Sequence, residues 1–209
     1  MPRYAQLERR TLAELLLAVG PDAPTINEGW TARDLAAHLV VRERRPDAAA
    51  GILLGPLRGH ADRVQATVAA QPFPQLVDQV RRAPWWSPVS NPLVDELTNL
   101  LEFFVHHEDL RRAQPNWRPR TLSAELDAAL WKRLPIVARL NLRRFPAAVL
   151  VQAPGHGEVS TGAGGDRLRL VGGPGELVMF LFGRQRVARV QLDGPPATAE
   201  RLRTTRFGV

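Results

Sequence analysis

The sequence predicts a chain of two domains, an all-helical domain over residues 1–145 and a small α+β domain over residues 146–209. The helical prediction rests on apolar residues that recur at helical spacing in segments separated by proline and glycine. The α+β prediction rests on short alternating segments between glycine-rich turns, which are typical of strands. A length of 209 residues is enough for two modest domains with their own cores.

Local signals predict where several of the helices begin or bend. Thr31 with Asp34 three residues later is a capping-box-like start, and Trp30 precedes it as a staple residue. Pro92 is favoured at the first position of a helix, whereas Pro135 is expected to kink the helix that contains it. The expected helices of the first domain span residues 3–19, 32–44, 47–57, 58–70, 75–82, 92–113 and 124–143.

The character of the sequence changes after residue 145. Residues 167–171 (RLRLV) and 186–192 (RVARVQL) alternate as half-buried strands do, and glycines separate the short segments. Further strands are expected at residues 147–153 and around Val159, and helices at residues 174–182 and 195–204.

Composition excludes several classes of function. The absence of a run of about 18 apolar residues predicts no membrane partner, and an N-terminus without an apolar signal core predicts a cytoplasmic protein. Cysteine is absent, so disulfides and thiolate ligands are excluded. The formal charge is +7, but the arginines form scattered pairs near expected helix ends, without the interleaved aromatics of single-strand binders. The sequence therefore predicts no nucleic-acid partner.

One expected helix carries a polar stripe on an otherwise apolar surface. The stripe residues recur at steps of four and three: Asp95, Asn99, Glu102, His106 and Asp109. A mostly apolar helix is usually buried, and buried charges need partners or a metal ion. Glu102 and His106 lie one turn apart on the same face, so the sequence predicts that both can bind one metal ion.

A catalytic metal site needs a third protein ligand and an open position. His107 is about 100° around the helix from His106 and is excluded, and His60 and His156 adjoin glycines expected in loops or on the surface. A lone histidine beside leucines, as His38 is, is usually a core residue. Its position on a second capped helix nevertheless makes it the expected third ligand, because facing helices commonly build such sites.

The residues around these histidines resemble a known family. WTARDLAAHL, which ends in His38-Leu39, resembles the W-T-x-x-D-L-x-x-H-L motif of the DinB-like, mycothiol-dependent maleylpyruvate isomerase family. EFFVHHED, from Glu102 to Asp109, resembles its E-x3-H-H-x-D motif, and Gly175 to Arg184 resembles the start and G-R ending of a helix in its C-terminal domain. The resemblance covers nearly the whole chain and extends to a branch described only as metal-binding.

This resemblance implies a DinB-like four-helix bundle followed by a small α+β domain. It implies that His38, Glu102 and His106 hold Zn²⁺ or another divalent ion, and that the ion activates the thiol of mycothiol for isomerisation or S-transfer on an electrophilic substrate. Arg184 is the expected catalytic residue, holding an anionic part of the substrate; helix C-capping is its alternative role.

Other interpretations stay open. Asp34 and Asp109 are candidates to orient the ligand histidines, although Asp34 has an alternative role in capping. In a metal-dependent hydrolase, Glu108 would be the general base. In a protein without catalysis, the metal would only stabilise the helices. The chain departs from the family at Asn27, where relatives often carry cysteine.

Overall fold

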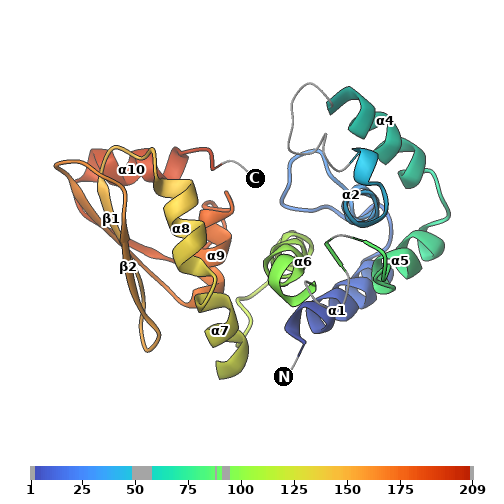
Figure 1. Ribbon diagram of the computed structural model, residues 1–209, viewed down its shortest axis with the longest axis horizontal. Helices are drawn as coiled ribbons and strands as arrows, with labels where there is room; N and C mark the ends of the chain where they lie inside the picture. Colours follow the sequence, from blue (N-terminus) through green and yellow to red (C-terminus); the bar gives the residue numbers. More distant parts are fainter. Residues whose placement is uncertain (1–2, 49–57, 88, 91–94, 208–209) are drawn as a thin grey trace. The chain divides into compact units, whose positions relative to one another are not determined.

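The computed structural model describes residues 3–48, 58–87, 89–90 and 95–207, which belong to two compact units (Figure 1). The first unit is Met1–Arg118 and the second is Pro119–Val209. This division differs from the boundary expected at residues 145 and 146. The two helices that follow residue 119 contact the helix and sheet of the second unit, and therefore belong to it. The expected combination of helical and α+β structure is confirmed.

The described part of the first unit is helical, apart from its turns and one isolated β-bridge. Helix α1 (Tyr4–Val19) packs against α5 (Phe73–Arg81) and α6 (Asp95–Arg111), and α2 (Ala32–Arg44) packs against α4 (Arg58–Ala69) and α5 (Figure 1). Their shared core is formed by leucine, valine, alanine and phenylalanine side chains, as the helical periodicity predicts.

The start of α2 is confirmed in detail. The Thr31 side chain accepts a hydrogen bond from the backbone N–H of Asp34, and the Asp34 carboxylate accepts one from the backbone N–H of Thr31. This reciprocal capping box satisfies two N–H groups that the first turn leaves unpaired. Most of α2 is buried, including His38.

Two expected helix segments lie partly outside the described residues. The predicted start at Pro92 falls on residues 91–94, and most of the predicted helix 47–57 falls on residues 49–57. The polar stripe of α6 is described from Asp95 onward. Asp95, Asn99, His106 and Asp109 are buried, so the prediction of a buried stripe is confirmed for these residues.

The second unit contains a four-stranded sheet in the order β2-β1-β3-β4. The central pair, β1 and β3, is parallel, whereas the two outer pairs are antiparallel. Val149 and Val151 of β1 lie opposite Leu168 and Leu170 of β3, and all four are buried on one face. The strands are β1 (Ala148–Ala153), β2 (Gly157–Thr161), β3 (Arg167–Val171) and β4 (Gln191–Asp193).

Helices cover the buried face of this sheet, with α8 against β2 and α9 against β1 (Figure 1). The expected helix 124–143 is two helices, because Pro135 stands at the start of α8 and cannot donate to a continuing helix. The expected strand 186–192 is shorter, since the N–H groups of Val187 and Ala188 donate to the Arg184 carbonyl in a turn. The helices are α7 (Ala124–Trp131), α8 (Leu134–Leu142), α9 (Pro174–Leu181) and α10 (Pro196–Thr204).

Across the described ranges, no helix combines the length and the apolar character that crossing a bilayer requires.

Candidate metal centre

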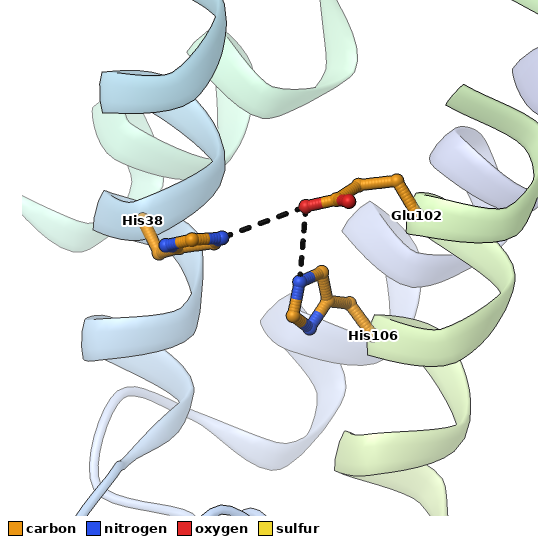
Figure 2. A group of neighbouring side chains, drawn as sticks. All are labelled: His38, Glu102 and His106. Carbon is orange, nitrogen blue, oxygen red and sulfur yellow. Dashed lines mark hydrogen bonds and ion pairs between the residues drawn. The ribbon is translucent and has the colours of Figure 1, made fainter. Parts of the chain in front are cut away.

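The structure brings together the three residues that the sequence predicts as metal ligands. His38 projects from α2, and Glu102 and His106 project from α6 toward it (Figure 2). One ligand atom of each residue lies within 4.8 Å of those of the other two. Among the described residues, this is the one group of histidines and carboxylates close enough to hold a metal ion together.

The two separations that involve Glu102 are close to those around a tetrahedral ion. Glu102 Oε1 lies 3.2 Å from His106 Nε2 and 3.5 Å from His38 Nε2. Zinc bonds to nitrogen and oxygen of about 2.0–2.2 Å place tetrahedral ligand atoms roughly 3.3–3.6 Å apart. Two imidazoles and a carboxylate are also a donor set typical of sites with an open position. The residues present therefore fit a divalent ion with little rearrangement.

A second carboxylate orients His106. The Nδ1 atom of His106 lies 3.0 Å from Asp109 Oδ2, so a proton on Nδ1 directs the lone pair of Nε2 toward Glu102 and His38. Asp109 is fully buried and also accepts a hydrogen bond from Asn27 Nδ2 at 3.2 Å. The expected orienting role of Asp109 thus has a matching contact. Asn27 holds this carboxylate from the loop before α2.

Aromatic contacts surround His38. Its ring centroid lies 5.2 Å from that of Trp30 and 5.1 Å from that of His106. Trp30 also packs against the core of the first unit, as expected for the residue that precedes a helix cap. Packing on both sides limits the rotamers of His38 and keeps its ring beside α6.

The contacts shift the pKa values of all three ligands. Burial lowers the pKa of His38 and outweighs its hydrogen bond with Glu102. Burial alone would raise the pKa of Glu102, but hydrogen bonds with His106 and His38 and the charge of Arg42 place it well below its usual range. Burial would likewise lower the pKa of His106, yet its hydrogen bonds with Asp109 and Glu102 raise it to about 9.

Arg42 is a neighbour of the site that the sequence interpretation missed. Its Nε lies 3.3 Å from Glu102 Oε1, and its Nη1 donates to Asn99 Oδ1 at 2.6 Å. Arg42 follows His38 by four residues on α2, so the same spacing that paired Glu102 with His106 would have placed it beside the ligands.

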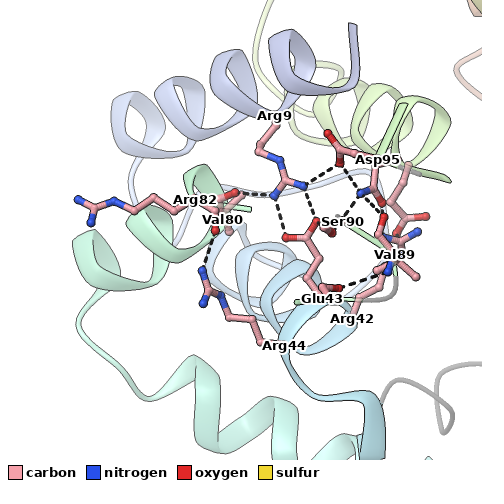
Figure 3. A network of polar contacts seen from close by, with 12 residues as sticks. Arg9, Arg42, Glu43, Arg44, Val80, Arg82, Val89, Ser90 and Asp95 are labelled. Atoms are coloured by element: carbon pink, nitrogen blue, oxygen red, sulfur yellow. Dashed lines mark hydrogen bonds and ion pairs between the residues drawn. The ribbon is translucent and has the colours of Figure 1, made fainter. Parts of the chain in front are cut away.

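Arg42 joins the metal centre to a buried polar network inside the first unit (Figure 3). Asn99 donates to Asp95 Oδ1 at 2.7 Å, and the hydroxyl of Ser90 donates to Glu43. Arg9, which is buried, pairs with Glu43 and donates to the Val80 carbonyl at 2.9 Å. The stripe on α6 therefore serves two adjoining functions, with ligands toward its C-terminal end and the network toward its N-terminal end.

The remaining predicted residues lie elsewhere. His107 Nδ1 lies 2.8 Å from Glu8 Oε2, as expected of a hydrogen-bonded neighbour, and His107 is not part of the group formed by His38, Glu102 and His106. Glu108 is buried and accepts hydrogen bonds from Arg111 and Arg112. Asp34 caps α2, as described above.

Arg184 belongs to the second unit and follows α9. Its Nη1 donates to the Phe182 carbonyl at 2.6 Å, a contact that matches the alternative role in helix capping. His156 lies in the turn between β1 and β2, as expected. His60 is within α4 rather than in a loop, half-exposed and 3.0 Å from Asp47, because the glycine before it does not interrupt that helix.

Comparison of the chain with protein-family models, curated proteins and solved structures gives no match.

Proposed function

We propose that the protein binds a divalent metal ion, with zinc as the first candidate, through His38, Glu102 and His106. The single observation that carries the proposal is the approach of the three candidate ligand atoms, from two helices, to within 4.8 Å of one another. A buried carboxylate on the outer nitrogen of His106 adds support, because metal-bound histidines almost always have such a partner.

The proposal extends to chemistry on a small-molecule thiol, with mycothiol as the candidate cofactor. Its support is the likeness of the WTARDLAAHL and EFFVHHED motifs to those of the mycothiol-dependent family. That likeness is also the basis for proposing a DinB-like four-helix bundle. The chain has no cysteine, so a reacting thiol must come from outside. A cytoplasmic location is part of the proposal, since that compartment keeps thiols reduced.

The three candidate ligand side chains are not completely buried. The side chains of His38, Glu102 and His106 are 11%, 17% and 10% exposed, respectively. A divalent ion held there supplies Lewis acidity, which lowers the pKa of a thiol or water bound beside it.

The protein's own residues prepare this site. Asp109 fixes the ring of His106, Trp30 restricts His38, and Arg42 stays beside Glu102 as a fixed positive charge. In this proposal, an ion held by His38, Glu102 and His106 would activate an external thiol toward an electrophilic carbon, which is the chemistry that isomerisation or S-transfer requires. The role of Arg184 as a substrate-binding residue is proposed from the G-R motif alone.

Two other functions have less support. Hydrolysis with Glu108 as general base conflicts with the two arginines that already occupy its carboxylate oxygens. A role limited to metal-dependent stability needs only the three ligands. Binding of a thiol at the metal would distinguish the proposed chemistry from this purely structural role.

The test is metal analysis of purified protein together with three variants. The wild-type chain is expected to hold about one divalent ion, and His38→Ala and His106→Ala are expected to hold almost none. His107→Gln is the matched control, because His107 is also buried on α6 but contacts Glu8. Equal metal contents in all four proteins, or no ion after reloading the wild type with zinc, would refute the metal site.

The thiol proposal is tested on cobalt-substituted protein. Titration with mycothiol is expected to produce a thiolate-to-cobalt charge-transfer band, which His106→Ala lacks. A protein that binds one cobalt ion but develops no such band has the metal site without the proposed thiol chemistry.

A further inference from the structure

The net positive charge of the chain lies entirely in the second unit. Residues 119–209 contain 14 arginines and lysines and 7 acidic residues, whereas residues 1–118 contain 14 of each. The formal charge of +7 is therefore that of the second unit alone. The proposed metal centre belongs to the first unit and does not account for this excess.

Four of these arginines line a single cavity beside the ends of α8 and α10. Its volume is about 370 Å³, which is within the range of small-molecule sites. Asn141 and Thr205 add polar groups to the lining, and no carboxylate contributes to it. The four arginines are Arg143, Arg144, Arg201 and Arg206.

Among the residues that the structure describes, no carboxylate pairs with the positive charges of this cavity. Over the described ranges, none of the four guanidinium groups forms an ion pair. Four like charges around one concave surface repel each other and produce a strong positive potential in it. An anion in the cavity relieves that repulsion.

Helix ends explain only part of this arrangement. Arg143 is the C-cap of α8 and Arg201 lies in the last turn of α10, where a cation offsets the helix dipole. However, Arg139 and Arg203 already serve that purpose in the last turns of the same two helices, and neither lines the cavity. The convergence of the other four therefore needs a further reason.

We infer that this cavity binds a small polyanion that carries phosphate or carboxylate groups. The planar guanidinium fork binds either group through two parallel hydrogen bonds. Nucleic acid is less suitable, because its backbone needs cations spread along a groove, whereas these four face one cavity. The site is independent of the metal centre and of the proposed thiol chemistry.

The test is calorimetric titration of the full chain with pyrophosphate and, separately, with citrate. The double variant Arg143→Gln/Arg201→Gln is expected to bind the preferred anion at least about tenfold more weakly, since each lost charge-assisted hydrogen bond contributes about that factor. The control is Arg139→Gln/Arg203→Gln, which removes the same charge from the same helices and is expected to bind as the wild type does. The preference between the two anions identifies the ligand as a phosphate or a polycarboxylate.

All four arginines of the two variants are exposed, so both proteins are expected to melt within a few degrees of the wild type. Equal weakening in both double variants would overturn the inference, because charge alone would then explain binding. Failure of the wild type to bind either anion would also overturn it. Tight binding of a DNA duplex that neither pyrophosphate nor citrate displaces would likewise overturn the inference.

Discussion

Both ring nitrogens of His106 face carboxylates. Nε2 lies 3.2 Å from Glu102 and Nδ1 lies 3.0 Å from Asp109. The two carboxylates have different surroundings, because Glu102 also faces His38 and Arg42 whereas Asp109 accepts a hydrogen bond from Asn27. At the scale of single residues, this asymmetry distinguishes the proposed ligand Glu102 from Asp109, which we propose orients the proposed ligand His106.

Replacing Asp109 by asparagine tests the orienting role. Asp109→Asn is expected to weaken zinc binding by about 10- to 100-fold, because a neutral amide holds the Nδ1–H of His106 less firmly. Competition with a chromophoric chelator measures the affinity. Asp34→Asn is the control, since Asp34 caps α2 without contacting a ligand. A folded Asp109→Asn protein with wild-type affinity would show that Asp109 does not orient His106.

Zinc affinity is also expected to depend on pH through His106. Hydrogen bonds with Asp109 and Glu102 raise the pKa of His106 to about 9 against the effect of burial, and a proton on the ring competes with the metal ion. The apparent affinity should therefore fall by about tenfold per pH unit as the pH decreases from 9 to 7. Calorimetry in buffers of different ionisation enthalpy should detect about one proton released per ion bound at pH 7. A pH-independent affinity over this interval would contradict the assignment.

At the scale of elements, Arg9 connects four helices around the buried network. It projects from α1 to Glu43 on α2, the Val80 carbonyl on α5 and Asp95 on α6 (Figure 3). Its guanidinium carbon also lies 4.1 Å from the centroid of the Phe103 ring. The network therefore fixes how α2 and α6, which carry the metal ligands, face each other.

Removing this connection is expected to destabilise the protein strongly. Arg9→Met leaves two buried carboxylates without their cation, and breaking a buried pair in this way costs about 3–5 kcal/mol of unfolding free energy. Urea denaturation measures the loss. Arg10→Met, the exposed neighbour on the same helix, should change the unfolding free energy by no more than about 0.5 kcal/mol. Equal effects of the two substitutions would mean that the network contributes little.

At the scale of the whole molecule, the two units have different charge and different candidate ligands. The first has balanced charge and a candidate cation site, and the second has all of the excess charge and a cavity lined by arginines. Each unit has its own buried core, one among helices and one between helices and a sheet.

Hydrogen exchange is expected to locate the effect of zinc within the first unit. A bound ion joins α2 to α6, so amides in these helices should exchange more slowly when zinc is added, because a ligand stabilises the state that binds it. Amides of β1 and β3, in the core of the second unit, serve as the internal reference. Equal slowing in that sheet, or slowing that persists in His106→Ala, would place the metal elsewhere.

Several features follow from the sequence alone because they depend on neighbours along the chain. The capping box of Thr31 and Asp34 and the common face of Glu102 and His106 are set by spacings of three and four residues on a helix. The alternation in Arg167–Val171 likewise predicts β3. Alternation failed at residues 186–190, where turn hydrogen bonds compete with strand pairing.

Only the tertiary structure decides which separate segments meet. It places His38 beside Glu102 across two helices, brings Arg42 to the same carboxylate, and assigns residues 119–145 to the second unit. It also gathers Arg143 and Arg206, which are far apart in that unit's sequence, around one cavity. Periodicity identifies the face that each helix buries. The element that packs against that face depends on how the whole core fits together, and a local sequence pattern carries no information about contacts between distant segments.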